Sequence, residues 1–250
     1  MMSPIRRLVL VTDFGDGIYV GQMRARLDDL IPGVPVVDLV HDLPPFRIDL
    51  AAYLLPALVR DMPAGSIYVC VVDPGVGGAR GGLLVQTRDS WFIGPDNGLL
   101  VPLVYWAEGT VVNRIGWCPS LLSASFHGRD WFAPAAARLA VGTDLQLCPI
   151  DPADMVGSDW PKERAAVVYV DRFGNLMTGL QATGRPRTHA LQVGERRLCH
   201  ARTFCEVASG EAFWYENAFG LVEIAVNLGR ADRELGLSPG APIGPFLPLG

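Results

Sequence analysis

The chain has 250 residues, of which 50% are hydrophobic and 19% are charged, and its formal net charge is −5. This length accommodates one large domain or two smaller ones, each with a sizeable core. The acidic balance argues against nucleic acid as the main partner, because no excess of basic side chains is available to neutralise phosphates.

The first half of the chain alternates predicted strands and helices. Arg6 and Arg7 precede a short apolar run that is too brief for a signal peptide and predicts a first strand instead. Apolar runs predict strands at residues 8–11, 36–40, 66–72, 83–86, 91–93 and 110–113. Apolar residues at helical spacing predict helices at 20–30, 46–61 and 130–141. This alternation is typical of an α/β fold with a mostly parallel sheet and helices on its faces.

The second half changes character after residue 141. Residues 142–164 contain three prolines and little periodicity, so we interpret them as a linker. Short alternating segments follow at 165–170, 176–180, 190–193, 197–200, 213–215 and 221–226, with a helical turn at 231–235. The spacing predicts a small all-β domain. We therefore expect an N-terminal domain over 1–141, a linker over 142–164 and a C-terminal domain over 165–250.

Two further features concern the cell compartment. The five cysteines are odd in number and no two have CxxC spacing, so neither a disulfide framework nor a zinc site is indicated. A reducing cytoplasm fits this pattern best. No apolar run approaches the roughly 20 residues that a membrane span requires, so we expect no contact with a membrane.

Four polar loops lie in the predicted α/β domain, at residues 12–17, 41–45, 73–80 and 125–130. Loops that follow parallel strands gather at one edge of an open sheet, where ligands bind. This arrangement predicts that four side chains converge there: Asp13, Asp73, Arg80 and His127.

Each of these residues also has a purely structural interpretation. Asp13 or Asp16 would serve equally well as a cap for the following helix. The loop that joins Asp73 to Arg80 contains a proline and three glycines, and it is also compatible with a turn closed by a surface ion pair. A lone histidine such as His127 is more often structural than catalytic. Neighbouring Arg129 and Asp130 fit an ordinary ion pair at a helix start. No polar cluster lies beside His41, His189 or His200 in the sequence, so we interpret these three histidines as structural.

The sharpest feature of the second domain is the run Asp171-Arg172-Phe173-Gly174-Asn175. An aromatic face stacks on a planar base, and an amide pairs with the edge of that base. A hairpin turn is the alternative, because Gly-Asn is a common turn pair. Residues 214–220 are similarly rich in aromatic and amide groups.

Five short motifs occur in a fixed order along nearly the whole chain. Together they resemble the S-adenosyl-L-methionine hydroxide adenosyltransferases, which are hydrolases similar to the fluorinase and chlorinase enzymes. The motifs are Thr12-Asp13-Phe14-Gly15, Val72-Asp73-Pro74-Gly75-Val76-Gly77, Gly94-Pro95-Asp96-Asn97-Gly98, Phe126-His127-Gly128-Arg129-Asp130 and Asp171-Arg172-Phe173-Gly174-Asn175.

The resemblance implies a two-domain fold, with an N-terminal α/β/α sandwich and a smaller C-terminal β-barrel. It implies a homotrimer in which S-adenosyl-L-methionine lies between the N-terminal domain of one subunit and the C-terminal domain of its neighbour. The implied reaction is hydrolysis of S-adenosyl-L-methionine to adenosine and L-methionine. The sulfonium compound is the substrate, and no cofactor or metal is implied.

The resemblance also implies roles for eight residues. The catalytic set of the family maps onto Asp73, Arg80 and His127. The substrate contacts map onto Asp13 for the ribose, Phe126, Asp171 for the methionine amine, Asn175 for the adenine, and Phe173 beside the adenine.

Two positions depart from the pattern of the relatives. Phe46 stands where the halogenases have a tryptophan beside the sugar, and Ala218 stands where many relatives have a serine. The contacts to the methionine carboxylate do not align between residues 227 and 230, so none is assigned.

Three other functions remain as alternatives. A halogenase is disfavoured because Asp73 would place a negative charge where a halide must bind. A metal-dependent nucleoside hydrolase is disfavoured because its first loop is rich in aspartate, whereas this loop has only Asp13 and Asp16. A protein that binds S-adenosyl-L-methionine or adenosine without turnover is the third alternative, and the presence of the Asp73, Arg80 and His127 set weighs against it.

Overall fold

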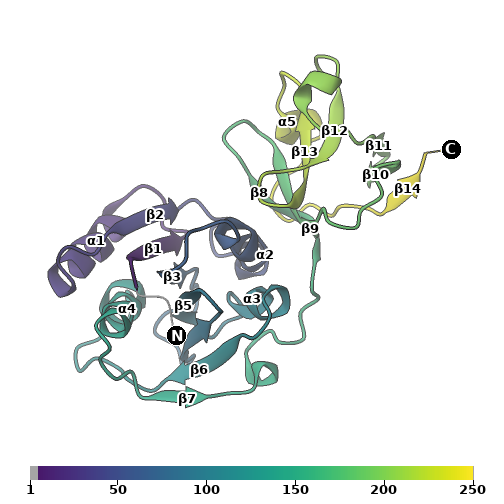
Figure 1. Cartoon of the computed structure of the whole chain (residues 1–250). Helices are drawn as coiled ribbons and strands as arrows, with labels where there is room; N and C mark the ends of the chain where they lie inside the picture. The colour runs from purple at the N-terminus through teal and green to yellow at the C-terminus, as the bar shows by residue number, and fades with distance from the viewer. Residues whose placement is uncertain (1–4, 250) are drawn as a thin grey trace. The chain divides into compact units, whose positions relative to one another are not determined.

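The computed structural model describes residues 5–249 (Figure 1). The chain forms two compact units. The first comprises the chain up to residue 52 together with residues 62–160, and the second comprises residues 53–61 and 161–250.

The first unit contains a seven-stranded sheet with the strand order β2-β1-β3-β5-β4-β6-β7. Four strands run parallel: β1 (Arg7–Thr12), β2 (Val36–Val40), β3 (Ser66–Val71) and β5 (Ser90–Pro95). Three strands extend the sheet in antiparallel pairs: β4 (Gly82–Gln86), β6 (Val111–Ile115) and β7 (Leu147–Pro149). Only one half of the sheet is therefore parallel. Strands β4 and β5 pair antiparallel because the three residues that join them are too few for the crossover that a parallel pair requires.

Strand β3 lies between β1 and β5, and all six of its residues are buried. Burial on both faces explains why its sequence is a continuous apolar run instead of an alternating one. The buried stretch continues through Val72 and ends at the dipeptide Asp73-Pro74. The predicted strands of this half are all present.

Helices cover the sheet on both faces. Helices α1 (Ile18–Leu30) and α4 (Ala133–Ala140) lie together on one face, and α3 (Val101–Trp106) lies across the sheet from them (Figure 1). Met23, Leu27 and Ala136 pack with side chains of β1 and β3 in one apolar core. The helix predicted at 46–61 is α2 (Ile48–Val59). The helix predicted at 130–141 begins earlier, with a π-helical turn at Gly128–Phe132 that runs into α4.

Two elements of the first unit are not predicted from the sequence. Helix α3 has six residues with a proline in its first turn, and β7 has three residues that are all exposed. Strand β7 and a short 3₁₀ turn at Pro152–Asp154 lie within residues 142–164, the segment expected to be a linker.

The second unit consists of two antiparallel sheets. One has the order β12-β13-β9-β8 and the other β11-β10-β14. The bounds are β8 (Arg164–Val170), β9 (Leu176–Gln181), β10 (His189–Val193), β11 (Arg196–Leu198), β12 (Ala212–Glu216), β13 (Leu221–Val226) and β14 (Phe246–Pro248), with a helical turn α5 (Ala231–Glu234) after β13. The six predicted strands are confirmed, and β14 is an additional one.

Trp214 links the two sheets of this unit. Its ring is fully buried in a common apolar core, and its indole N–H donates to the carbonyl of His189 on the other sheet at 3.1 Å. Among residues 5–249, no helix is both long enough and apolar enough to cross a membrane.

Candidate active site

Asp73 and Arg80 form a buried ion pair at the carboxyl end of β3. Arg80 Nε lies 3.0 Å from each carboxylate oxygen of Asp73, and Arg80 Nη2 donates to Oδ2 as well. The side chains are only 4% and 10% exposed, respectively. The surface ion pair considered above is therefore wrong, because these two charges are almost completely withdrawn from water.

The Arg80 guanidinium lies over two aromatic rings. Its central carbon is 5.1 Å from the centroid of Phe132 and 5.7 Å from that of Trp131, a distance at which a cation is attracted to a ring face. The Nη1 atom of Arg80 is buried and has no hydrogen-bond partner within residues 5–249. A buried donor of this kind is costly unless it is satisfied, so Arg80 retains N–H capacity for a bound molecule.

His127 completes the set through Arg80. The Nη2 atom of Arg80 lies 2.8 Å from Nδ1 of His127. A guanidinium only donates, so Nδ1 must accept, and the imidazole is neutral with its proton on Nε2. The pKa of His127 agrees with this assignment: burial lowers it, the charge of Arg80 lowers it further, and Asp73 and Asp130 oppose the shift.

The segment around His127 is held by the start of the following helix. His127 directly precedes the π-helical turn, in which the Asp130 N–H donates to the Phe126 carbonyl at 3.1 Å. Arg129 Nε lies 2.6 Å from Asp130 Oδ1, which confirms the predicted ion pair. Asp130 also accepts the Ser123 N–H at 3.2 Å. These contacts fix the loop that presents His127.

Asp13 lies at the same edge of the sheet. Its carboxylate accepts the backbone N–H of Phe46 at 3.0 Å. Burial raises the pKa of Asp13, the charge of Asp73 raises it further, and the Phe46 hydrogen bond opposes the shift. The capping interpretation is wrong for both Asp13 and Asp16, because Gly17 is the N-cap of α1 and no side chain caps that end.

A small cavity of about 130 Å³ lies against this set. Asp73 and His127 line it, together with the rings of Phe14, Tyr19 and Phe126. The Phe126 ring centroid lies 5.3 Å from that of Tyr19 and 5.9 Å from that of Phe14, so the three rings form one apolar wall. A water molecule occupies about 30 Å³ in the liquid, so the cavity suits a few waters or one small portion of a ligand.

Two residues of the loop motifs brace the Asp73 segment. Asn97 Nδ2 donates to the carbonyl of Val72 at 2.9 Å. Gly77 has φ of 82°, and a Cβ placed on it would lie 2.3 Å from the carbonyl oxygen of Ala124. Only glycine allows the loop after β3 to approach the loop before His127 this closely.

The second unit contains the other predicted group of residues. Asp171 Oδ1 accepts the backbone N–H groups of Phe173 at 2.9 Å and Asn175 at 2.8 Å, and Oδ2 accepts the Asn175 side-chain amide at 3.0 Å. The local structure is thus a tight turn between β8 and β9, as the hairpin alternative predicted. The turn leaves the Phe173 side chain 74% exposed.

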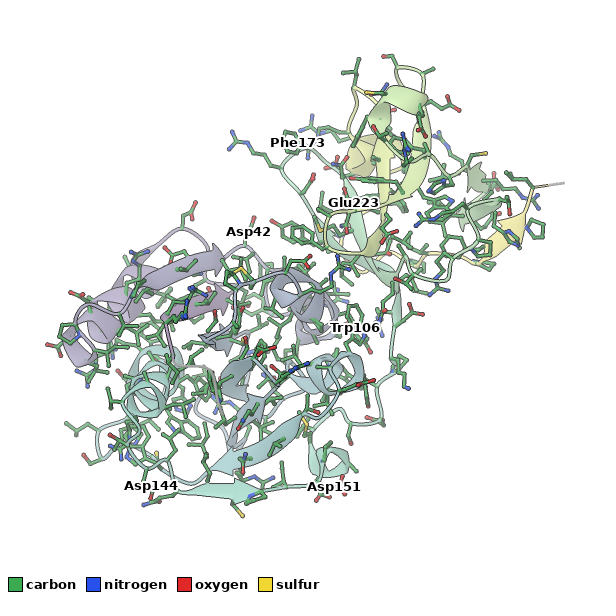
Figure 2. The ribbon with its side chains drawn as sticks, in the orientation of Figure 1. Asp42, Trp106, Asp144, Asp151, Phe173 and Glu223 are labelled. Atoms are coloured by element: carbon green, nitrogen blue, oxygen red, sulfur yellow. The ribbon has the colours of Figure 1, made fainter. Side chains whose placement is uncertain are left out.

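A larger pocket of about 610 Å³ lies beside this turn. Its volume is within the range of small-molecule sites. Asp171, Phe173 and Asn175 line it, and so do Tyr215, Asn217 and Phe219 from the aromatic and amide-rich run at 214–220. Phe204 and Glu223, which the sequence did not single out, also line it. Figure 2 labels Phe173 on the β8–β9 turn and Glu223 on β13, both in the second unit.

Glu223 is the centre of a buried polar group in this pocket. It is 2% exposed, it accepts the Asn217 side-chain amide at 2.7 Å, and it accepts the Tyr215 hydroxyl. Burial raises the pKa of Glu223, and Asp171 raises it further, whereas the two hydrogen bonds oppose the shift. Tyr215 and Asn217 belong to the aromatic and amide-rich run noted in the sequence. Glu223 is the single charged residue within the apolar run of β13, which is buried at all six positions.

The structure thus gathers the predicted residues into two groups. The first unit brings together Asp13, Asp73, Arg80, Phe126 and His127, and the second brings together Asp171, Phe173 and Asn175. Within residues 5–249, no three His, Cys, Asp or Glu side chains form a group that could hold a metal ion.

An α/β sheet with a buried carboxylate, guanidinium and imidazole at its edge, joined to an antiparallel unit with an aromatic pocket, defines an enzyme that acts on a small molecule. The chain belongs to the SAM hydroxide adenosyltransferase family. The model of the N-terminal domain of this family matches residues 8–148, and the model of the C-terminal domain matches residues 165–244.

Individual relatives agree with the family models. A protein of Thermus thermophilus named (R)-S-adenosyl-L-methionine hydrolase is 37% identical, covering 96% of this chain and 99% of its own. A protein of Salinispora tropica with the same name is 36% identical, and the match covers 96% of this chain and 97% of that protein. The crystal structure of an uncharacterized conserved protein from Thermotoga maritima matches with a TM-score of 0.80 and 28% sequence identity. The match covers 94% of this chain and 98% of that protein.

The close approach at Gly77 leads to a first prediction. Gly77→Ala adds a methyl group against the Ala124 carbonyl and places alanine at positive φ, so we expect a loss of about 2 kcal/mol or more in the free energy of unfolding. Urea denaturation at pH 7 measures this. Gly21→Ala is the control: it lies in α1 with no atom near its added methyl group, and we expect no loss. Equal stability of the two variants would contradict the role of Gly77.

The protonation of His127 leads to a second prediction. We expect its NMR titration midpoint to lie below the ordinary value of 6.5, with the neutral ring protonated on Nε2. Arg80→Gln removes a positive neighbour and should raise the midpoint, whereas Asp73→Asn removes a negative neighbour and should lower it. Ring ¹⁵N chemical shifts measured against pH report both the midpoint and the tautomer. Shifts of the same sign in the two variants would show that these charges do not set the pKa.

Proposed function

We propose that this protein hydrolyses S-adenosyl-L-methionine to adenosine and L-methionine by attack of water on the ribose C5′ carbon. Family membership over both units carries this proposal, because relatives at 36% and 37% identity over nearly the whole chain are named for this hydrolysis. The buried set of Asp73, Arg80 and His127 supports it, since it combines one acceptor with several donors beside a small cavity.

The reaction makes few demands on acid catalysis. A bond forms between the water oxygen and C5′ while the C5′–S bond breaks, and its electron pair moves to sulfur. The sulfonium becomes a neutral thioether, so the leaving group needs no proton. The enzyme must instead hold a water molecule in line with the C5′–S bond and accept one of its protons. Positioning of this kind contributes up to roughly 7–11 kcal/mol in the best intramolecular reactions.

The hydrogen-bond directions support a division of roles within the set. Arg80 only donates, and the Nδ1 lone pair of His127 is already occupied by Arg80, so His127 offers a donor at Nε2. Asp73 is then the acceptor of the three and the group toward which the water directs its proton. Arg80 and His127 hold Asp73 and the attacking oxygen. The apolar wall of Phe14, Tyr19 and Phe126 favours the loss of positive charge at sulfur, because it excludes water.

For substrate binding we adopt the roles expected for the family. Asp13 binds the ribose hydroxyls and Phe126 contacts the substrate from the cavity wall. Asp171 binds the methionine amine, Asn175 pairs with the adenine, and Phe173 stacks beside it. The large exposed area of the Phe173 ring supports this role, since a planar ligand would cover it.

We further propose that the active protein is a cytoplasmic homotrimer, in which the first unit of one subunit and the second unit of its neighbour form each site. We also propose that the two antiparallel sheets close into a small β-barrel. Two isolated bridges support closure, Ala166 to Pro242 and His200 to Trp214. The absence of any disulfide among the five cysteines is compatible with a reducing compartment.

A halogenase is the closest alternative in chemistry. A fluorinase of Actinoplanes sp. is 24% identical over 201 residues, which is a more distant match than the hydrolases. The buried Asp73 carboxylate favours hydrolysis, because a halide in the adjacent cavity would meet a negative charge.

Product analysis tests the proposed reaction. Purified protein incubated with S-adenosyl-L-methionine should release adenosine and methionine in equal amounts, with no 5′-halo-adenosine when chloride or fluoride is in excess. Asp73→Asn removes the proton acceptor and should lower kcat about 10²-fold or more while substrate binding persists. Asp29→Asn, an exposed carboxylate on α1, is the matched control and should retain full activity. Halo-adenosine as the main product, or no product, would overturn the proposal.

Mixing two inactive variants tests whether subunits share a site. Asp73→Asn disables the site in the first unit, and Asp171→Ala disables it in the second. If each site is formed by two subunits, coexpressed variants in equal amounts should recover about one quarter of the wild-type activity, because one half of the subunits supply each intact part. Sites confined to single chains would give no recovery above the sum of the two variants.

A further inference from the structure

His41 is joined by a hydrogen bond to Thr12, the residue before Asp13. Its ring follows β2 and is 11% exposed. His41 Nδ1 is 2.7 Å from the hydroxyl oxygen of Thr12, and His41 Nε2 is 3.2 Å from Asp38 Oδ1. Asp38 in turn pairs with Arg24 of α1. The sequence showed no polar cluster beside His41, and the structure corrects this, because β1 and β2 are adjacent parallel strands that end side by side.

The hydrogen bond between Thr12 and His41 is the central contact of this group. Nε2 of His41 is buried and has no hydrogen-bond partner within residues 5–249, so the Asp38 carboxylate lies near it without accepting from it. The Thr12 hydroxyl accepts the Phe14 N–H at 3.3 Å and forms its second hydrogen bond with Nδ1 of His41. Thr12 is completely buried, so its hydroxyl depends on these two partners.

The same histidine also holds the far side of the Asp13 turn. The Gly15 N–H donates to the backbone carbonyl of His41 at 2.6 Å. The Phe46 N–H donates to Asp13 itself, and Phe46 adopts φ of 63°, which is unusual for a residue other than glycine. Hydrogen bonds therefore join the loop after β1 to the loop after β2 at three places: at Thr12, at Asp13 and at Gly15.

We propose that His41 is a positioning residue for Asp13: through the Thr12 hydroxyl it fixes the direction of the Asp13 carboxylate, and it thereby strengthens binding of the ribose. This inference rests on the proposed function for the ribose role of Asp13. A hydrogen bond to the buried Thr12 hydroxyl constrains orientation more than an apolar contact of the same volume, because a hydrogen bond has a required direction. His41 does not contact the substrate in this scheme.

Thr12→Val and Thr12→Ser form the matched pair that tests the proposal. Valine preserves the shape of threonine and removes the hydroxyl, whereas serine retains it. We expect Thr12→Val to weaken adenosine binding about tenfold and to raise KM for S-adenosyl-L-methionine similarly, with kcat changed less than about threefold. Thr12→Ser should remain near wild type. His41→Leu should behave like Thr12→Val, and His41→Asn, which keeps an acceptor, should restore part of the affinity.

A double-mutant cycle with Asp13→Asn separates positioning from general loss of stability. Adenosine affinity is measured by calorimetry for wild type, both single variants and the double variant, with urea denaturation of each. If Thr12 acts through Asp13, the tenfold effect of Thr12→Val should shrink to less than about twofold in the Asp13→Asn background. An undiminished effect there, or no adenosine binding by the wild type, overturns the inference. Adenosine binding without turnover would instead contradict the proposed hydrolysis alone.

Discussion

The buried ion pair of Asp73 and Arg80 is the constraint on which the rest of the first unit depends. Removing two charges from water costs several kcal/mol for each ion, and only close geometry with additional partners offsets this. The structure supplies such partners: both carboxylate oxygens contact the guanidinium, two aromatic rings lie beneath it, and His127 accepts from Nη2, which also donates to Asp73. Asp73 is withdrawn from water because it directly follows a buried apolar segment, and β3, an inner strand of the sheet with all six residues buried, provides that segment.

The same pair determines which chemistry is available. Because Arg80 occupies Nδ1 of His127, the neutral histidine offers only a donor, at Nε2, and Asp73 is the hydrogen-bond acceptor among the three side chains. An enzyme that cleaves a sulfonium needs no acid for its leaving group, so a single acceptor among donors is sufficient. The cavity beside Asp73 has a volume of about 130 Å³, and the pocket beside Asp171 in the second unit has a volume of about 610 Å³.

Much of this arrangement is predictable from the sequence. The continuous apolar run of β3 and the glycine-rich loop after it indicated a buried strand with Asp73 at its end, and the rule for parallel strands brought Asp13 and His127 to the same edge. Helix α3 and strands β7 and β14 have three to six residues, too few for a periodic signal. The bond between Thr12 and His41 was missed because it depends on which strands become neighbours, and no local pattern encodes that. Glu223 was overlooked although it has a local signal, a single charge within the apolar run 221–226.

One structural device occurs in both units. In each, an aspartate carboxylate accepts the backbone N–H of a phenylalanine whose ring is left in solvent: Asp13 holds Phe46, and Asp171 holds Phe173. The two rings are 73% and 74% exposed, although burial of each would be favourable by about 1.5–3 kcal/mol. A fold that fixes the backbone of an exposed aromatic residue maintains a flat apolar surface for something else to cover. A nucleoside has two suitable features, hydroxyl groups for a carboxylate and a planar base for a ring. Each unit therefore presents an exposed aromatic surface beside a carboxylate of its own.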